Sequence, residues 1–326
     1  MEYGKPWLSV EEQIDKLRGR GCHIDDATSG SSVLREVGYY RLTGYLYPFR
    51  ESCPVADDDG HRRVVVRDQY RTGTDIRHAE ALIDFDRRLR LLVIEAVERV
   101  EVAVRTQLGH VLGAHSPFAH EDSTLFTEAF TTPRPTDADG VSAHTAWLVR
   151  VAERENSSDE AFVGHFRTKY DGRMPIWALT EILELGHLAR LYGGLRNDVA
   201  TEIARSFGVP TKKTMLSWLS SVNYVRNVSA HHARLFNRKL VAAPKRPRPS
   251  EVPLLGHLSD GTAPKEFGVY NTLAVLAYLL RSIPSDRDWA PRAAALVRSF
   301  PAAGPVTVAS MGVAAGWLDE ALWADT

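Results

Sequence analysis

Cysteine is scarce in this chain, and long apolar runs and glycine-rich phosphate loops are missing altogether. The 326 residues include only two cysteines, Cys22 and Cys53, and neither has neighbours at the spacing of thiolate zinc ligands. This pattern excludes a disulfide framework and is typical of a reducing compartment. The chain starts without an apolar signal region, and its longest apolar run, residues 272–280, is too short to span a membrane. We therefore expect a soluble, cytoplasmic protein without a metal or another cofactor.

Net charge is also nearly absent, because 40 Lys and Arg residues oppose 41 Asp and Glu residues. Any contact with nucleic acid must then come from a local patch rather than from bulk charge. Residues 205–248 offer such a patch: this stretch contains ten Lys or Arg residues and no Asp or Glu at all. A block of this kind favours phosphate binding. A solvated helix face followed by a basic tail would have the same composition.

Apolar residues recur at three- and four-residue steps through most of the chain, which predicts an all-α protein. The strongest periodicity spans residues 76–113 and predicts one long amphipathic helix. Other helices are expected at 8–21, 31–49, 146–156, 160–170, 176–195, 198–209, 212–240, 267–283 and 288–299. The sequence "DDDG" at 57–60 predicts a turn, and "VVVRDQY" at 64–70 is either a short strand or the edge of a loop.

These elements predict a helical bundle with an N-terminal helical extension and C-terminal helices. The expected parts are an extension at 1–75, a helical core at 76–240 with a loop excursion at 114–143, a proline-rich basic connector at 241–266, and C-terminal helices at 267–326 that pack on the core.

One Arg-x4-His pair stands out by its surroundings. The chain contains three such pairs, so the spacing alone does not select a site. Only Arg226 and His231 lie in the acid-free block, within the sequence "VRNVSAHHARLFNR". Their polar neighbours are Asn227, His232, Arg234 and Asn237.

The geometry of a straight helix separates the two members of this pair. At about 100° per residue, Arg226 and His231 point about 140° apart, whereas Asn227 and His231 share a face. A single helix therefore does not focus both side chains on one phosphate. A second copy of the chain, facing the first across a two-fold axis, would bring two arginines and two histidines together. We therefore expect a homodimer.

The residue types in this pair suit the cleavage of RNA without a metal. Histidine titrates near neutral pH and could take a proton from a ribose 2′-OH or return one to the leaving 5′-oxygen. Arginine presents a planar set of donors to a phosphate whose charge increases in the transition state. Attack by the 2′-OH would leave a 2′,3′-cyclic phosphate, and DNA would be inert. Alternatively, His231 and His232 are ordinary polar residues that satisfy backbone groups at a helix end.

The motif also carries a resemblance to a known family. "RNVSAHHARLFNR" resembles a segment of the Abi family of bacterial abortive-infection proteins, of the AbiD and AbiF type, in the HEPN superfamily. Four further blocks resemble the same family in the same order: "KPWLSVEEQIDKLRGRG" with "VGYYRLTGYLYPF", "FDRRLRLLVIEAVERVEVAVRT", "MPIWALTEILELGHLARLYGGL" and "MGVAAGWLDEALW". The match covers nearly the whole chain.

The resemblance implies a HEPN-like helical bundle and a role in defence against phage by abortive infection. HEPN ribonucleases typically bring two Arg–His motifs together by dimerising and need no metal. Arg226 and His231 match the catalytic pair, and Asn227 matches the polar residue after the arginine. Some relatives are thought to work with a structured non-coding RNA. The superfamily also contains non-catalytic nucleotide-binding and antitoxin-like members.

Two further groups of residues are candidates for supporting roles. Glu98 and Glu101, on the predicted long helix, could position Arg226 or tune a histidine, or they could form a solvated acidic stripe paired with nearby arginines. Aromatic residues around Tyr40 and Arg41 could stack on bases, or could pack the N-terminal helix on the main domain. The candidate RNA-binding residues are Lys212, Lys213, Arg238, Lys239, Tyr40 and Arg41.

The sequence thus predicts a metal-independent endoribonuclease of an abortive-infection system, acting as a homodimer on RNA. Arg226 and His231 are its expected catalytic residues, with Asn227, His232, Arg234 and Asn237 in support. Two alternatives remain. One is a non-catalytic RNA- or nucleotide-binding protein that regulates a toxin or scaffolds a non-coding RNA complex. The other is a regulatory scaffold that senses a phage protein.

Overall fold

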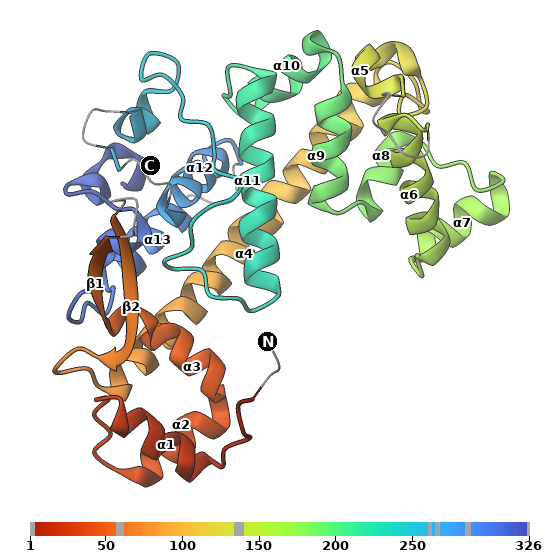
Figure 1. The fold of residues 1–326 in the computed structure, drawn as a ribbon. Helices are drawn as coiled ribbons and strands as arrows, with labels where there is room; N and C mark the ends of the chain where they lie inside the picture. The colour runs from red at the N-terminus through yellow and green to blue at the C-terminus, as the bar shows by residue number, and fades with distance from the viewer. Residues whose placement is uncertain are drawn as a thin grey trace. The chain divides into compact units, whose positions relative to one another are not determined.

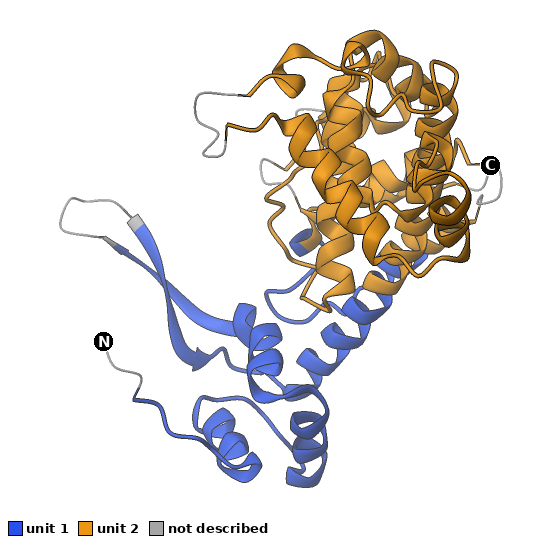
Figure 2. Cartoon of the chain, turned by 90° about the vertical axis from the view of Figure 1, so that its right-hand side faces the viewer, with its two compact units in different colours: residues 1–89, 295–310 blue, residues 90–294, 311–326 orange. Residues whose placement is uncertain are grey.

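The structure is a computed structural model that describes residues 4–56, 62–133, 140–259, 263–264, 268–283 and 288–324 (Figure 1). Over these residues the regular secondary structure is helical apart from one two-stranded sheet, which confirms the all-α expectation. It divides into two compact units (Figure 2): residues 1–89 with 295–310, and residues 90–294 with 311–326. Among the described helices, none is both long enough and apolar enough to cross a membrane.

The first unit begins with three short helices. The first, α1 (Val10–Gly19), opens with a capping box in which Ser9 and Glu12 satisfy each other's backbone N–H groups. The single helix expected over 31–49 is in fact α2 (Ala27–Val37), α3 (Tyr39–Leu46) and a 3₁₀ turn at Tyr47–Phe49. The break falls at Gly38, whose φ of 83° lies in the left-handed region and cannot continue a right-handed helix.

A β-hairpin follows these helices, where the sequence left a choice between strand and loop. Strand β1 (Arg50–Ala56) pairs antiparallel with β2 (Arg62–Tyr70), with Pro54 opposite Val64. The β-branched valine run therefore forms a strand, as its residue types favour. The turn expected at residues 57–60 lies outside the described residues. The part of the chain that the sequence predicts to be a helical extension, residues 1–75, therefore also contains a β-hairpin.

The long helix α4 (Ile76–Gly113) forms where the periodicity predicts it, and it contributes residues to both units. Its first part belongs to the core of the first unit. There, Tyr45 donates a hydrogen bond of 2.6 Å to the buried carboxylate of Asp86, and Phe85 packs edge-on against Phe300. The hydrogen bond thus satisfies a carboxylate that burial would otherwise leave unpaired.

The remaining helices lie in the second unit, except that the last of them, at Trp289–Arg298, is divided between the two units after residue 294. The helices are α5 (Glu128–Thr131), α6 (Ala143–Ser157), α7 (Ala161–Lys169), α8 (Ile176–Leu179), α9 (Leu185–Gly194), α10 (Asn197–Ser206), α11 (Lys212–Ala230), α12 (Val269–Leu280) and α13 (Trp289–Arg298). Helix α11 packs against α9, α10 and α12. The 3₁₀ segments include Ser123–Leu125, Thr180–Ile182, Pro253–Ser259, Trp317–Asp319 and Ala321–Trp323. The expected loop excursion at 114–143 therefore includes α5 and a 3₁₀ turn.

The helix expected at 176–195 is interrupted between α8 and α9. Leu183 is extended, with φ −92° and ψ 134°. The carbonyl groups released there are satisfied by arginines from other helices: Arg154 donates to Ile182 at 3.1 Å, and Arg105 donates to Leu183 at 3.1 and 3.0 Å. These partners are distant in sequence, so the helical periodicity of the segment could not reveal the break.

Candidate functional site

Helix α11 carries the Arg-x4-His motif at its C-terminal end. It starts at Thr211, whose side-chain oxygen accepts from the Thr214 N–H at 3.1 Å, as expected for an N-cap. Its buried face follows helical spacing: Met215, Trp218, Leu219, Val222, Val225 and Val228. This face fixes the rotation of the helix, and Arg226 and Asn227 are then placed half-buried beside it.

The helix ends at Ala230, ten residues before the end that the sequence pattern predicts. The Ala233 N–H bonds to the Val228 carbonyl and the His232 N–H to the Ser229 carbonyl, both at 3.0 Å. This is the hydrogen-bonding pattern of a Schellman motif, and His232 occupies its left-handed position with φ 55°. Glycine normally takes that position, because a side chain there costs about 1 kcal/mol. The two histidines therefore lie at a helix end and not on a continuing helix.

The position of His231 follows from this ending. Its backbone N–H bonds to the Asn227 carbonyl at 3.0 Å, which completes the last helical turn, and its side chain is exposed. Within the described part of the chain, its imidazole forms no hydrogen bond or ion pair with another residue. Both ring nitrogens thus remain available to a substrate or to a second copy of the chain.

Arg226 faces a different environment, a cavity of about 450 Å³ beside α4. The α4 residues that line it are Ile94, Val97, Glu98, Glu101, Val102 and Arg105, and α11 adds Arg226 and Ala230. The two carboxylates that the sequence nominates as supporting groups therefore lie in the same cavity as Arg226. His231 does not line this cavity, and within the described chain no hydrogen bond joins the side chains of the two predicted catalytic residues.

Glu101 is the buried charge in this cavity. Its carboxylate forms an ion pair with the Arg105 guanidinium one turn along α4, and Arg105 is anchored in turn by the Leu183 carbonyl. Burial raises the pKa of Glu101, and the positive charges of Arg105 and Arg226 oppose that rise. The carboxylate thus depends on both arginines for its charge compensation.

Asn227, the next residue in the chain, also contacts the Arg226 guanidinium. The Nη1 of Arg226 donates a hydrogen bond to the Oδ1 of Asn227 at 3.1 Å. A guanidinium has five N–H donors, so donors remain for a phosphate. Arg226 is therefore a charged group that lies between the Asn227 amide and a cavity that two carboxylates also line.

The residues after the helix fold back onto α11. Arg238 donates to the Arg234 carbonyl at 2.9 Å and to the Tyr224 hydroxyl at 3.4 Å. Arg234 and Asn237 are half-buried, and the buried Oδ1 of Asn237 has no hydrogen-bond partner among the described residues. A buried acceptor of this kind can take a hydrogen bond from water or from another bound donor.

Some lysines and arginines of the acid-free block, residues 205–248, bond to backbone carbonyls, whereas others are exposed to solvent. Lys212 is half-buried, its ammonium donates to the Leu195 carbonyl, and burial lowers its pKa. Arg246 donates to the Pro264 carbonyl at 2.7 Å. Lys213 and Lys239 are exposed. The two other candidates for RNA contact, Tyr40 and Arg41, lie on α3 in the first unit; Tyr40 is exposed and Arg41 half-buried.

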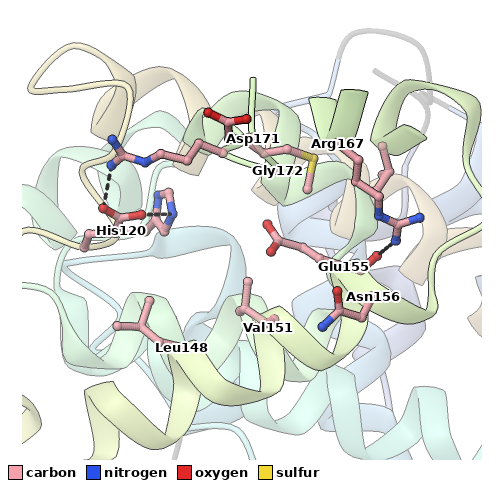
Figure 3. Close-up of a pocket in the computed structure, with 13 residues that line it drawn as sticks. His120, Leu148, Val151, Glu155, Asn156, Arg167, Asp171 and Gly172 are labelled. Atoms are coloured by element: carbon pink, nitrogen blue, oxygen red, sulfur yellow. Dashed lines mark hydrogen bonds and ion pairs between the residues drawn. The ribbon is translucent and has the colours of Figure 1, made fainter. Parts of the chain in front are cut away.

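A second cavity, of about 480 Å³, lies in the same unit and was not suggested by the sequence (Figure 3). Figure 3 shows Glu155 pointing into it from α6, with Asp171 opposite. His120 lies in its wall, and burial lowers the pKa of this histidine to about 4. The sequence places His120 in an irregular segment without helical spacing, so no periodic signal could have revealed its burial. No described contact connects this cavity with Arg226 or His231.

One group in the described residues has the composition of a metal site, although the sequence predicts none. His23 lies 2.9 Å from an oxygen of Asp25 and 2.9 Å from an oxygen of Asp75. The Arg77 guanidinium bonds to both carboxylates, at 3.1 and 2.7 Å. This cation supplies the positive charge that the two carboxylates need, so the cluster is satisfied as an ion-pair network. Arg77 also keeps the pKa of Asp75 well below its ordinary value.

Comparison with curated proteins and with solved structures gives no match to this chain. The family described as Abi-like protein matches residues 32–237. The matched region starts in α2 and ends just after the Arg-x4-His motif, so it includes α4, α11 and the cavity between Glu101 and Arg226. Membership supports a role in abortive-infection defence. The chain belongs to the Abi-like protein family.

Proposed function

We propose that the chain is a metal-independent endoribonuclease of the HEPN type that acts in abortive infection. The observation that carries this proposal is the end of α11, which holds the Arg226 guanidinium beside Asn227 and a buried carboxylate and exposes His231 at the helix end. These groups provide a fixed positive charge and a titratable base, the two requirements for cleavage by an internal 2′-OH.

The proposed reaction uses the ribose of the substrate as nucleophile. An imidazole nitrogen of His231 accepts the 2′-OH proton as O2′ attacks phosphorus, and the bond from phosphorus to O5′ breaks. The leaving O5′ takes a proton from an imidazolium, either His231 after its first step or the His231 of a second copy. The products are a 2′,3′-cyclic phosphate and a 5′-hydroxyl end, so protons and charge balance without an added reactant.

Arg226 stabilises the negative charge that forms on the non-bridging oxygens. Asn227 and Glu101 orient its guanidinium, and Glu101 is thus a positioning residue rather than a catalytic one. His232 and Arg234 support the substrate near the helix end. Asn237 offers its unsatisfied oxygen to a donor on the same substrate.

A homodimer completes this site. Arg226 faces the α4 cavity, whereas His231 is exposed at the helix end. Two-fold packing of the α11 ends would allow His231 of one copy to act on a phosphate held by Arg226 of the other. The proposal therefore places the active site between two copies of the chain.

One observation favours a second candidate, a non-catalytic RNA- or nucleotide-binding protein. Catalytic histidines are commonly oriented by a hydrogen bond to their second ring nitrogen. In the described structure no residue bonds to the His231 ring. If a second copy does not supply that partner, the same residues would bind RNA without cleaving it.

A cleavage assay in EDTA separates the two candidates. Single-stranded RNA, the same RNA with 2′-O-methyl riboses, and matching DNA would be incubated with the wild-type protein and with Arg226→Ala and His231→Ala. Matched controls are Arg205→Ala, an exposed arginine of the same acid-free block, and His110→Ala, the histidine of another Arg-x4-His pair.

The proposal expects RNA-only cleavage that leaves a cyclic phosphate, is lost in both motif variants and is retained in both controls. RNA binding without cleavage by the wild-type protein would favour the second candidate. Cleavage that survives both motif substitutions would exclude this site.

A further inference from the structure

The first unit exposes two large aromatic side chains that line one groove. Trp7 is 85% exposed and Tyr40 is 75% exposed, values that are unusual for such large rings. Both line a groove of about 590 Å³ between the segment before α1 and the start of α3. The other lining residues are Lys5, Pro6, Leu8, Gln13, Lys16 and Tyr39.

Contacts with α1 hold the segment that carries Trp7. Gln13 donates a side-chain hydrogen bond to the Leu8 carbonyl at 2.9 Å. The capping box of Ser9 and Glu12 fixes the angle at which the chain enters α1. The exposed ring of Trp7 is therefore attached to backbone that a helix anchors on its C-terminal side.

The opposite wall is held by α3. The rings of Tyr39 and Tyr40 meet edge-to-face, with centroids 5.9 Å apart and planes at 87°. Tyr39 also accepts a hydrogen bond from the Arg20 guanidinium at 3.5 Å. The groove thus presents aromatic surfaces from two separate elements rather than from one flexible side chain.

The charged residues that line the groove are all positive. Lys5 and Lys16 line it, and none of its lining residues is acidic. Neither ammonium group has an ion-pair partner among the described residues. Exposed rings combined with unneutralised lysines are the features with which proteins bind single-stranded nucleic acid: bases stack on the rings and phosphates pair with the cations.

We propose that this groove binds single-stranded RNA, with bases stacked on Trp7 and Tyr40 and phosphates contacted by Lys5 and Lys16. The proposal rests on the proposed function in one respect, namely that RNA is the ligand of this protein. It adds an RNA-binding surface in the first unit, on residues that are not part of the Arg-x4-His motif. Stacking accepts any base, so the groove supplies affinity without strong sequence preference.

RNA binding by the groove can be measured by fluorescence anisotropy with a labelled single-stranded RNA. An RNA of about 12 nucleotides is within the range of lengths that such sites bind. The protein would carry His231→Ala, so that the RNA stays intact whether or not the wild-type protein cleaves it. We expect Trp7→Ala and Tyr40→Ala each to weaken binding about tenfold, since loss of one stacked base has an effect of that size. Trp7→Phe and Tyr40→Phe should retain most of the affinity. The matched control is Tyr170→Ala, which removes an exposed tyrosine in the second unit.

Salt dependence tests the lysines separately. Lys5→Ala and Lys16→Ala should each reduce the slope of log affinity against log salt by about one. A folded Trp7→Ala/Tyr40→Ala double variant that binds the RNA as tightly as its parent would overturn the proposal. So would binding of anionic phospholipid vesicles, but not RNA, through these residues. Both results are independent of cleavage, so a failure of the groove is distinguishable from a failure of the proposed nuclease.

Discussion

Glu101 of α4 and Arg226 of α11 line one cavity, and the positive charge of Arg226 lowers the pKa of the buried Glu101 carboxyl against the rise that burial causes. The guanidinium thus compensates part of the charge of the carboxylate, and under the proposed function the carboxylate in turn positions the guanidinium. The arginine of the Arg-x4-His motif thus interacts electrostatically with a residue of the long helix α4.

This relationship predicts that Glu101→Gln impairs catalysis through the position of Arg226. The variant keeps the shape of the side chain but removes its charge, so Arg226 loses an electrostatic partner. We expect the single-turnover rate constant for RNA cleavage to fall about 10- to 100-fold, as misplacing a group that stabilises the transition state typically does.

The matched control is Glu98→Gln, because Glu98 lines the same cavity but is exposed. The measurement is single-turnover cleavage by both variants at equal folded fraction, checked by thermal melting. An equal effect of the two substitutions would contradict a specific positioning role for Glu101.

The left-handed conformation of His232 predicts a difference between two substitutions there. Both His232→Gly and His232→Ala remove the imidazole, but only glycine adopts a φ of 55° without a steric cost. We expect the glycine variant to be the more stable of the two by about 1 kcal/mol. Denaturant unfolding of the two variants measures this difference directly. Equal stabilities would mean that the backbone at residue 232 relaxes to another conformation.

His120 predicts a loss of stability in mild acid. Burial lowers its pKa to about 4 in the folded protein, whereas an unfolded histidine has a pKa of about 6.5. The unfolded state therefore binds more protons between these values, and stability falls as the pH decreases from 6.5 to 4. Over that interval the loss amounts to about 3 kcal/mol.

His120→Gln should flatten this part of the stability curve, and His115→Gln, at an exposed histidine nearby, should not. Thermal melting at half-unit pH steps provides the comparison. A wild-type curve that is already flat from 6.5 to 4 would show that His120 titrates normally.

The lysines of the acid-free block should differ in their effect on RNA binding. Lys213 and Lys239 are exposed, whereas the ammonium of Lys212 donates to the Leu195 carbonyl. We expect Lys213→Ala and Lys239→Ala each to weaken RNA binding and to reduce its salt slope by about one. Lys212→Met should lower the melting temperature and leave the salt slope unchanged. A reduced slope in Lys212→Met would show that this lysine leaves its carbonyl partner to reach phosphate.

Helices with a clear apolar period are where sequence and structure agree best. Residues 76–113 form α4 as predicted, and Ser9 and Thr211 cap their helices as their side chains favour. The differences fall where a distant partner or a backbone conformation intervenes. Leu183 breaks a predicted helix because Arg105 satisfies its carbonyl, and His232 ends α11 although its sequence offers no glycine there.

For the candidate site too, some features could be predicted from the sequence and others required the structure. The motif, its charge and its neighbours were nominated from sequence, because residue type and spacing are local properties of the chain. The roles of Arg226 and His231 in catalysis stay predictions. The burial of Glu101 and the exposure of Trp7 required the structure, since neither follows from the residue type.

The sequence by itself thus determined the helical class, most helix positions and the choice of residues to test. Local hydrogen bonding and apolar spacing suffice for these, because they involve residues within a few turns of one another. Only the tertiary structure decided which side chains meet. Glu101 and Arg226 share a cavity because α4 and α11 pack beside it, and Trp7 and Tyr40 share a groove because the segment before α1 lies against α3. Contacts between residues far apart in the chain depend on how whole elements pack, and no local pattern encodes that packing.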